Sequence, residues 1–223
     1  MKEYSLPTRD ECFDLMRRYD VPSHIFEHNL AVAKLGVFLA CKLREKGVTV
    51  DAELVDRACL LHDILRVIDF EQSNYGRFQT DPTEPQQARW RQLRARYKPL
   101  HHEDAACELL KDKYPVLATT IRKHKYVALL DEKDRPRTWE EKLVYYADKR
   151  VMQGKIVPLA TRLEEAHKRN VHVHGSAASS KANTAKVDPL IFQLEKEIFD
   201  QIGLTPADVT DEVVDSYLNR AID

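Results

Sequence analysis

The stretch LLHDILR, residues 60–66, places two side chains that can bind metal inside an otherwise apolar run. The residues before them, DRACLL at 56–61, have the composition of the buried face of a helix. Burying the imidazole of His62 and the carboxylate of Asp63 costs several kcal/mol unless a partner compensates them. The pair therefore predicts a buried polar or metal site near the C-terminal end of this helix.

The composition favours a helical protein with a substantial core. Of the 223 residues, 43% are apolar and 32% are charged, which suits helices with solvated outer faces. The low glycine content, 6 residues against 10 prolines, argues against a turn-rich β-sandwich or barrel. A net charge of −1 provides no overall basic field, so we expect neither nucleic acid nor membrane as a partner, although a local basic patch stays open.

The cysteines and the N-terminus indicate a cytoplasmic protein. The four cysteines form no CxxC pair, and three of them lie in apolar helical stretches, as reduced core thiols do. The N-terminal segment MKEYSLPTRDE has no apolar signal-peptide region. No apolar run approaches the ~20 residues that a membrane-spanning helix needs.

Helical periodicity covers nearly the whole chain, and neither an internal repeat nor a sheet is expected. Capping boxes at 8–11 (TRDE) and 138–141 (TWEE) each predict the start of a helix. Pro22 starts a long helix that Gly47 ends, and Asp51 caps the next one. The remaining helices are expected at about 102–112, 115–125, 138–152, 159–169, 188–202 and 210–221.

Two segments depart from this pattern. Residues 69–99 are polar, aromatic and basic, and we interpret them as an insertion with a short helix through RWRQLRARY, residues 89–97. That helix is either a solvated amphipathic helix or a lid that supplies cations and base stacking. Residues 172–186 have a low-complexity composition typical of a mobile loop. We expect a domain over 1–155 and a C-terminal helical extension over 156–223.

Residues that can ligate metal recur about once per predicted helix. A helical bundle can bring such residues together in its core. Mixed histidine and aspartate ligands suit iron, manganese, zinc, cobalt or nickel, and an aspartate can bridge two ions through its two oxygens. Other histidines, such as His24 and His167, are expected to be surface or hydrogen-bonded residues. The candidates in chain order are His28, His62, Asp63, His101, His102, His124 and Asp148.

The order H…HD…H…H…D resembles the HD superfamily of metal-dependent phosphohydrolases, from about residue 24 to 152. The segments HEDAACELL and VYYADKRV resemble the third and closing motifs of that family. Two additional histidines resemble its dinuclear branch, which includes bacterial diadenosine-tetraphosphate hydrolases. Many members read HDIGK where this chain reads HDILR, so Arg66 keeps the positive charge of the lysine. The resemblance implies an all-α HD-domain helical bundle.

Carried over residue by residue, the resemblance implies two divalent metal ions. Asp63 would bridge them, and His102 is preferred to His101 because it fits the spacing to Ala105 and Ala106 better. Iron or manganese is expected first, with zinc, cobalt, nickel or magnesium left open. One ion would be bound by His28, His62, Asp63 and Asp148, and the other by Asp63, His102 and His124.

The resemblance also implies hydrolysis of a phosphoester or phosphoanhydride bond. Two ions about 3.5–4 Å apart can clamp a phosphoryl group, and water between them becomes hydroxide near neutral pH. His62 and Asp63 would be catalytic, and Arg66, Lys149 and His101 would contact the substrate. We expect a small phosphorylated substrate, first of all a nucleotide, and the apolar positions of 190–198 leave a homodimer open. Two alternatives remain, a di-iron oxygenase of the same fold and a non-catalytic ligand-sensing module.

Overall fold

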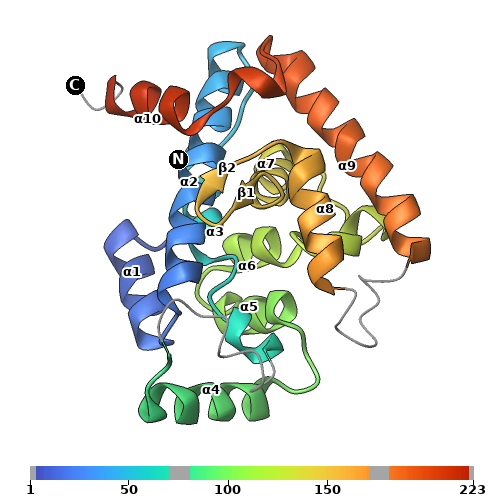
Figure 1. Cartoon of the computed structure of the whole chain (residues 1–223). Coiled ribbons are helices and arrows are strands. Elements are labelled where there is room, and N and C mark those ends of the chain that lie inside the picture. Colours follow the sequence, from blue (N-terminus) through green and yellow to red (C-terminus); the bar gives the residue numbers. More distant parts are fainter. Residues whose placement is uncertain (1–3, 71–80, 171–180, 221–223) are drawn as a thin grey trace.

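The computed structural model describes residues 4–70, 81–170 and 181–220, and these residues are helical almost throughout (Figure 1). This confirms the predicted all-α fold. The elements are α1 (Arg9–Arg18), α2 (Ser23–Glu45), α3 (Ala52–Leu61), η1 (Arg66–Asp69), α4 (Glu84–Tyr97), α5 (His102–Leu110), α6 (Pro115–Arg122), η3 (Tyr126–Leu130), α7 (Trp139–Asp148), β1 (Val151–Met152), β2 (Lys155–Ile156), α8 (Leu159–Asn170), α9 (Lys181–Ile202), η5 (Pro206–Asp208) and α10 (Asp211–Arg220).

The predicted helix boundaries near the N-terminus are confirmed by their caps. Thr8 and Glu11 form the capping box of α1, and the side chain of Asp51 accepts hydrogen bonds from the backbone of the first turn of α3. After α2 the chain turns at Gly47, whose φ of +79° suits glycine because it has no Cβ. Local sequence therefore fixes where α1 and α3 begin and where α2 ends.

Helix α2 is the centre of the bundle. It packs against α3, α7, α9 and α10 (Figure 1). Buried residues of α9, such as Ile191 and Ile198, belong to the same core as Phe38 of α2 and Tyr145 of α7. Helices on both sides of residue 155 thus contribute to one core. The division of the chain at that residue stays a prediction.

The sequence prediction was wrong at the end of α7 and at the start of α9. Helix α7 ends at Asp148, and residues 151–156 form a short antiparallel hairpin instead. Gln153 and Gly154 adopt φ of +51° and +74°, which a two-residue hairpin turn requires. Residues 181–186, predicted as loop, belong to α9, while 171–180 lie outside the described residues.

The helix predicted within the 69–99 insertion exists and is longer than expected. It begins at Glu84, because Thr83 and Gln86 form a capping box. Trp90 is 1% exposed and its Nε1 donates a hydrogen bond to the backbone oxygen of Asp20, 3.0 Å away. Tyr97 is also buried. The lid alternative, in which aromatic rings of this helix stack on a base, is therefore wrong for Trp90 and Tyr97, because both rings pack inside the protein.

Within the described ranges, none of the helices is both long and apolar enough to cross a lipid bilayer.

The close approach of α2 and α3 depends on Gly36. A Cβ at this position would lie 2.8 Å from Cys59 Sγ and 3.0 Å from Val55 Cγ1. We expect Gly36→Ala to destabilise the fold by about 1–3 kcal/mol, because overpacking forces the helices apart. Urea denaturation measures this, and the double variant with Cys59→Ala should regain part of the loss. Full stability of Gly36→Ala alone would contradict this packing.

Candidate metal centre

The end of α3 sets the position of the centre. The helix ends at Leu61, earlier than the sequence suggested, and His62 and Asp63 lie in the turns that follow. Successive i→i+3 hydrogen bonds, such as Arg66 N to Asp63 O at 3.0 Å, tighten the chain into η1. This turn directs the two polar side chains toward the space between α2, α5, α6 and α7.

One group of ligand candidates lies where α2 and α7 meet the end of α3. The Nε2 atom of His28 is 3.1 Å from Asp148 Oδ1, and the Nε2 atom of His62 is 3.5 Å from the same oxygen. Asp63 Oδ2 is 3.8 Å from His62 Nε2. Three elements distant in sequence thus direct their ligand atoms toward one point, as the sequence pattern proposed.

A second group lies beside the first, toward α5 and α6. His102 Nε2 is 3.0 Å and His124 Nε2 is 3.7 Å from Asp63 Oδ1, and the two nitrogens are 3.2 Å apart. Both imidazoles are buried, with exposures of 2% and 3%. Asp63 therefore directs one carboxylate oxygen at each group, which is the arrangement of a ligand that bridges two ions.

The hydrogen bonds of the histidines leave their Nε2 atoms available for metal. His62 Nδ1 donates to the backbone oxygen of Cys59 at 2.7 Å, and His124 Nδ1 donates to that of Ile121 at 2.5 Å. These bonds fix the tautomer with a lone pair on Nε2, as in known metal sites. His62 Nε2 is fully buried and has no hydrogen-bond partner. A divalent ion fits this donor set and would compensate that atom.

The electrostatics of the centre also favour a cation. Burial alone would raise the pKa of Asp63, but His62 and His102 hold it well below its usual range. The pKa of Asp148 is likewise low, because Lys149 and His28 outweigh the effect of burial. Burial lowers the pKa of His124, which keeps that imidazole neutral and able to coordinate. Although burial lowers the pKa of His62 and His102, the charge of Asp63 on His62 and of Glu103 on His102 raises both values, so the carboxylates draw positive charge into the centre. A divalent ion would supply that charge in place of the protons.

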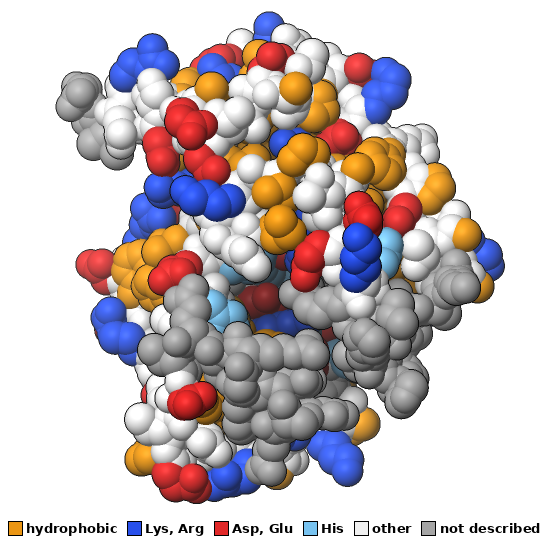
Figure 2. Space-filling view, viewed as in Figure 1, with side chains coloured by type: hydrophobic (Ala, Val, Ile, Leu, Met, Phe, Trp, Pro, Cys, Tyr) orange, Lys and Arg blue, Asp and Glu red, His pale blue; other side chains and the backbone are white. Residues whose placement is uncertain are grey.

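The centre is reachable from solvent. Figure 2 shows a hollow near the middle of this face, with acidic, basic and histidine side chains at its floor. The side chains of Asp63 and Asp148 keep exposures of 14% and 15%, and that of Arg66 keeps 34%. A small substrate can therefore approach the ligands without unfolding of the described helices.

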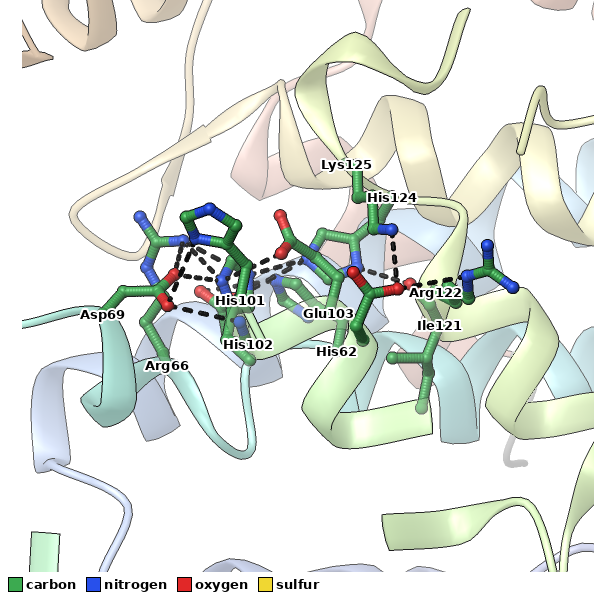
Figure 3. A network of polar contacts seen from close by, with 12 residues as sticks. His62, Arg66, Asp69, His101, His102, Glu103, Ile121, Arg122, His124 and Lys125 are labelled. Atoms are coloured by element: carbon green, nitrogen blue, oxygen red, sulfur yellow. Dashed lines mark hydrogen bonds and ion pairs between the residues drawn. The ribbon is translucent and has the colours of Figure 1, made fainter. Parts of the chain in front are cut away.

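The three residues predicted to contact substrate occupy different environments. Arg66 lies at the rim and its Nη1 is 3.0 Å from His102 Nδ1 (Figure 3). The side chain of His101 is 75% exposed, and Asp69 lies beside it. Lys149 is buried, and its ammonium donates to the backbone oxygen of His124 and to Asp148. This geometry favours a positioning role for Lys149 and leaves substrate contact to Arg66 and His101.

Asp69, which no sequence motif singles out, orients His102. Its carboxylate accepts hydrogen bonds from His102 Nδ1 at 2.5 Å and from the backbone N–H of His102 at 3.2 Å (Figure 3). This is the carboxylate–histidine arrangement that holds metal ligands in place. Arg94 of α4 braces this segment by donating to the backbone oxygens of Val67, Ile68 and Phe70. Because Asp69 falls at the start of the 69–99 insertion, no helical periodicity points to it.

Glu103 is the other carboxylate that the sequence analysis did not single out. Its Oε2 atom is 3.3 Å from His102 Nδ1, and the side chain is 14% exposed. Burial would raise its pKa, but His102 and His124 lower it. An acidic residue in the first turn of a helix is ordinarily explained by the helix dipole, which hid this signal.

The comparisons with known proteins agree with the geometry. The model of the HD domain family matches residues 25–152, more than half of the chain, so the protein belongs to the HD domain family. HD domains are in general metal-dependent phosphohydrolases, and the grouped histidines and aspartates fit a metal site. Searches of curated proteins and of solved structures give no significant match.

The choice between His101 and His102 can be tested by metal content. We expect His102→Ala to lose the second ion, because its buried Nε2 faces Asp63, and His101→Ala to retain both ions. Elemental analysis of the two purified variants, with circular dichroism to verify folding, measures this. The reverse result would move the ligand to His101.

Asp69 should matter for metal affinity although it faces the far nitrogen of His102. Because loss of such a partner typically weakens metal binding 10- to 100-fold, we expect Asp69→Ala to bind one of its ions more weakly by about that factor. Competition with a chromogenic chelator measures the affinity. Asp14→Ala, on the solvent side of α1, is the matched control. Equal affinities in the two variants would contradict the role of Asp69.

Proposed function

We propose that this protein is a dinuclear metal-dependent phosphohydrolase. The observation that supports this best is Asp63, whose two oxygens face two separate groups of imidazoles, His28 and His62 on one side and His102 and His124 on the other. A carboxylate placed this way serves both ions at once. Together with membership in the HD family, this arrangement makes phosphoryl chemistry the best-supported activity.

The ligand residues would hold two divalent ions, which supply charge neutralisation at the phosphoryl group and an acidified water. His62 and His124 contribute Nε2 lone pairs that their backbone hydrogen bonds fix in place. Arg66 lies beside the second group and can pair with two phosphate oxygens through its planar guanidinium. His101, at the solvent edge, can provide a further contact.

The substrate we propose is a small phosphorylated molecule, first of all a nucleotide, cleaved at a phosphoester or phosphoanhydride bond. The likeness to the diadenosine-tetraphosphate hydrolase branch supports a nucleotide, and iron or manganese suits the mixed ligand set. We further propose that the enzyme is cytoplasmic and binds neither membrane nor nucleic acid. The homodimer that the sequence leaves open stays a prediction. No feature of the described residues favours the oxygenase or the sensing module.

The first experiment is the metal content of protein purified without added metal or chelator. About two ions per chain support the dinuclear site. Hydrolysis of a panel of nucleotides and simple phosphate esters should then stop after chelation and return when Mn²⁺ or Fe²⁺ is added. Uptake of O₂ without phosphate release would instead establish the oxygenase, and full metal loading without either activity would establish the sensing module.

Asp63→Ala should abolish this hydrolysis and remove at least one ion. Since loss of an outer partner of a ligand already costs 10- to 100-fold, we expect the activity to fall by more than about 100-fold. Asp14→Ala, which alters an exposed carboxylate far from the centre, is the control. Normal turnover by Asp63→Ala would exclude the proposed mechanism.

A further inference from the structure

A cavity of about 360 Å³ lies between the start of α2 and the first half of α4. Its volume is within the range of small-molecule sites, about 300–1,000 Å³. Trp90 anchors α4 here through its hydrogen bond to Asp20, and α4 lies at the bottom of the view in Figure 1. The cavity is lined by Val21, Pro22, Ser23, His24, Phe26, Glu27, Pro82, Gln86 and Trp90.

This cavity lies next to the metal centre. His24, in its wall, precedes the ligand candidate His28 by four residues on α2, so the two side chains lie on the same face of the helix one turn apart. The charges of His28 and Asp63 both act on His24, whose pKa burial lowers. The cavity and the metal centre therefore share one face of the first turns of α2.

The lining of the cavity does not suit a phosphate. Among the described residues that form it, none is lysine or arginine, and Glu27 contributes a carboxylate that repels anions. The cationic side of the centre lies elsewhere, where Arg66 and His101 lie beside Asp69 (Figure 3). The charge distribution therefore orients a substrate, with its phosphate toward Arg66 and its uncharged part toward α2 and α4.

The polar groups of the cavity complement a hydrogen-bonding ring. The Oε1 atom of Gln86 accepts from the backbone N–H and the hydroxyl of Thr83, at 2.9 and 3.0 Å, in the capping box of α4. This bond leaves the Nε2 amide of Gln86 as a donor, and Glu27 is an acceptor. Pro22, Pro82 and Phe26 add apolar surfaces. A donor and an acceptor between apolar walls match the edge and faces of a nucleobase.

We propose that this cavity binds the nucleoside part of a nucleotide substrate. The proposal rests on the phosphohydrolase activity proposed above and adds to it the place where the nucleoside binds and the direction in which the substrate lies. It also implies that substrates with a second phosphate at the nucleoside end are excluded, because that phosphate would meet Glu27.

Binding of nucleosides without phosphate tests the cavity independently of hydrolysis. Titration of the full-length protein with adenosine, guanosine, cytidine and uridine, followed by ligand-observed NMR, should show binding of at least one. Gln86→Glu retains the acceptor of the capping box and replaces the donor amide with a carboxylate, so we expect binding to weaken about three- to tenfold. Arg91→Ala, on the exposed side of α4, should bind like the wild type.

Kinetics test the same assignment in the active enzyme. We expect Gln86→Glu to lower kcat/KM for the preferred nucleoside monophosphate about three- to tenfold relative to kcat/KM for methyl phosphate. We expect Glu27→Gln to raise kcat/KM for a nucleoside bisphosphate, because the carboxylate that repels its second phosphate is removed. Equal losses on nucleotide and methyl phosphate, or no nucleoside binding by the wild type, would overturn the cavity assignment. Nucleoside binding without any phosphate release would keep the cavity and reject the phosphohydrolase.

Discussion

The sharing of Asp63 between two groups of histidines is the constraint on which the rest of this structure depends. One carboxylate can face both groups only if the chain turns directly after α3 and if α2, α5 and the turn after α6 bring His28, His102 and His124 close to it. Buried carboxylates and imidazoles cost free energy unless they are compensated. The bundle compensates them with backbone hydrogen bonds to His62 and His124 and, we propose, with metal.

The packing around α2 serves this constraint. Gly36 allows α3 to approach closely, and the backbone oxygen of Cys59, the residue that faces Gly36, orients the ring of His62. The same close contact therefore contributes to stability and to the tautomer of a ligand candidate. Lys149 adds a similar connection, since its buried ammonium joins Asp148 of α7 to the segment that carries His124.

The insertion that follows η1 is part of this organisation. Helix α4 contributes Trp90 to the core and Arg94 to the carbonyl oxygens of η1, and η1 in turn places Asp69 against His102. The start of α4 also forms one wall of the cavity beside α2. A segment that reads as a peripheral addition in sequence therefore supports the second group of ligands and shapes the space in which substrate would lie.

The sequence by itself determined the helical class, most helix boundaries and the candidate ligands, because periodicity, capping boxes and the HD pair are local signals. It also favoured His102 over His101 from spacing, although their roles stay predictions. Only the tertiary structure decided that Asp69 orients His102, that Lys149 is buried and that Trp90 and Tyr97 pack inward. These facts depend on contacts between residues far apart in the chain, and no local pattern encodes which carboxylate will meet which imidazole.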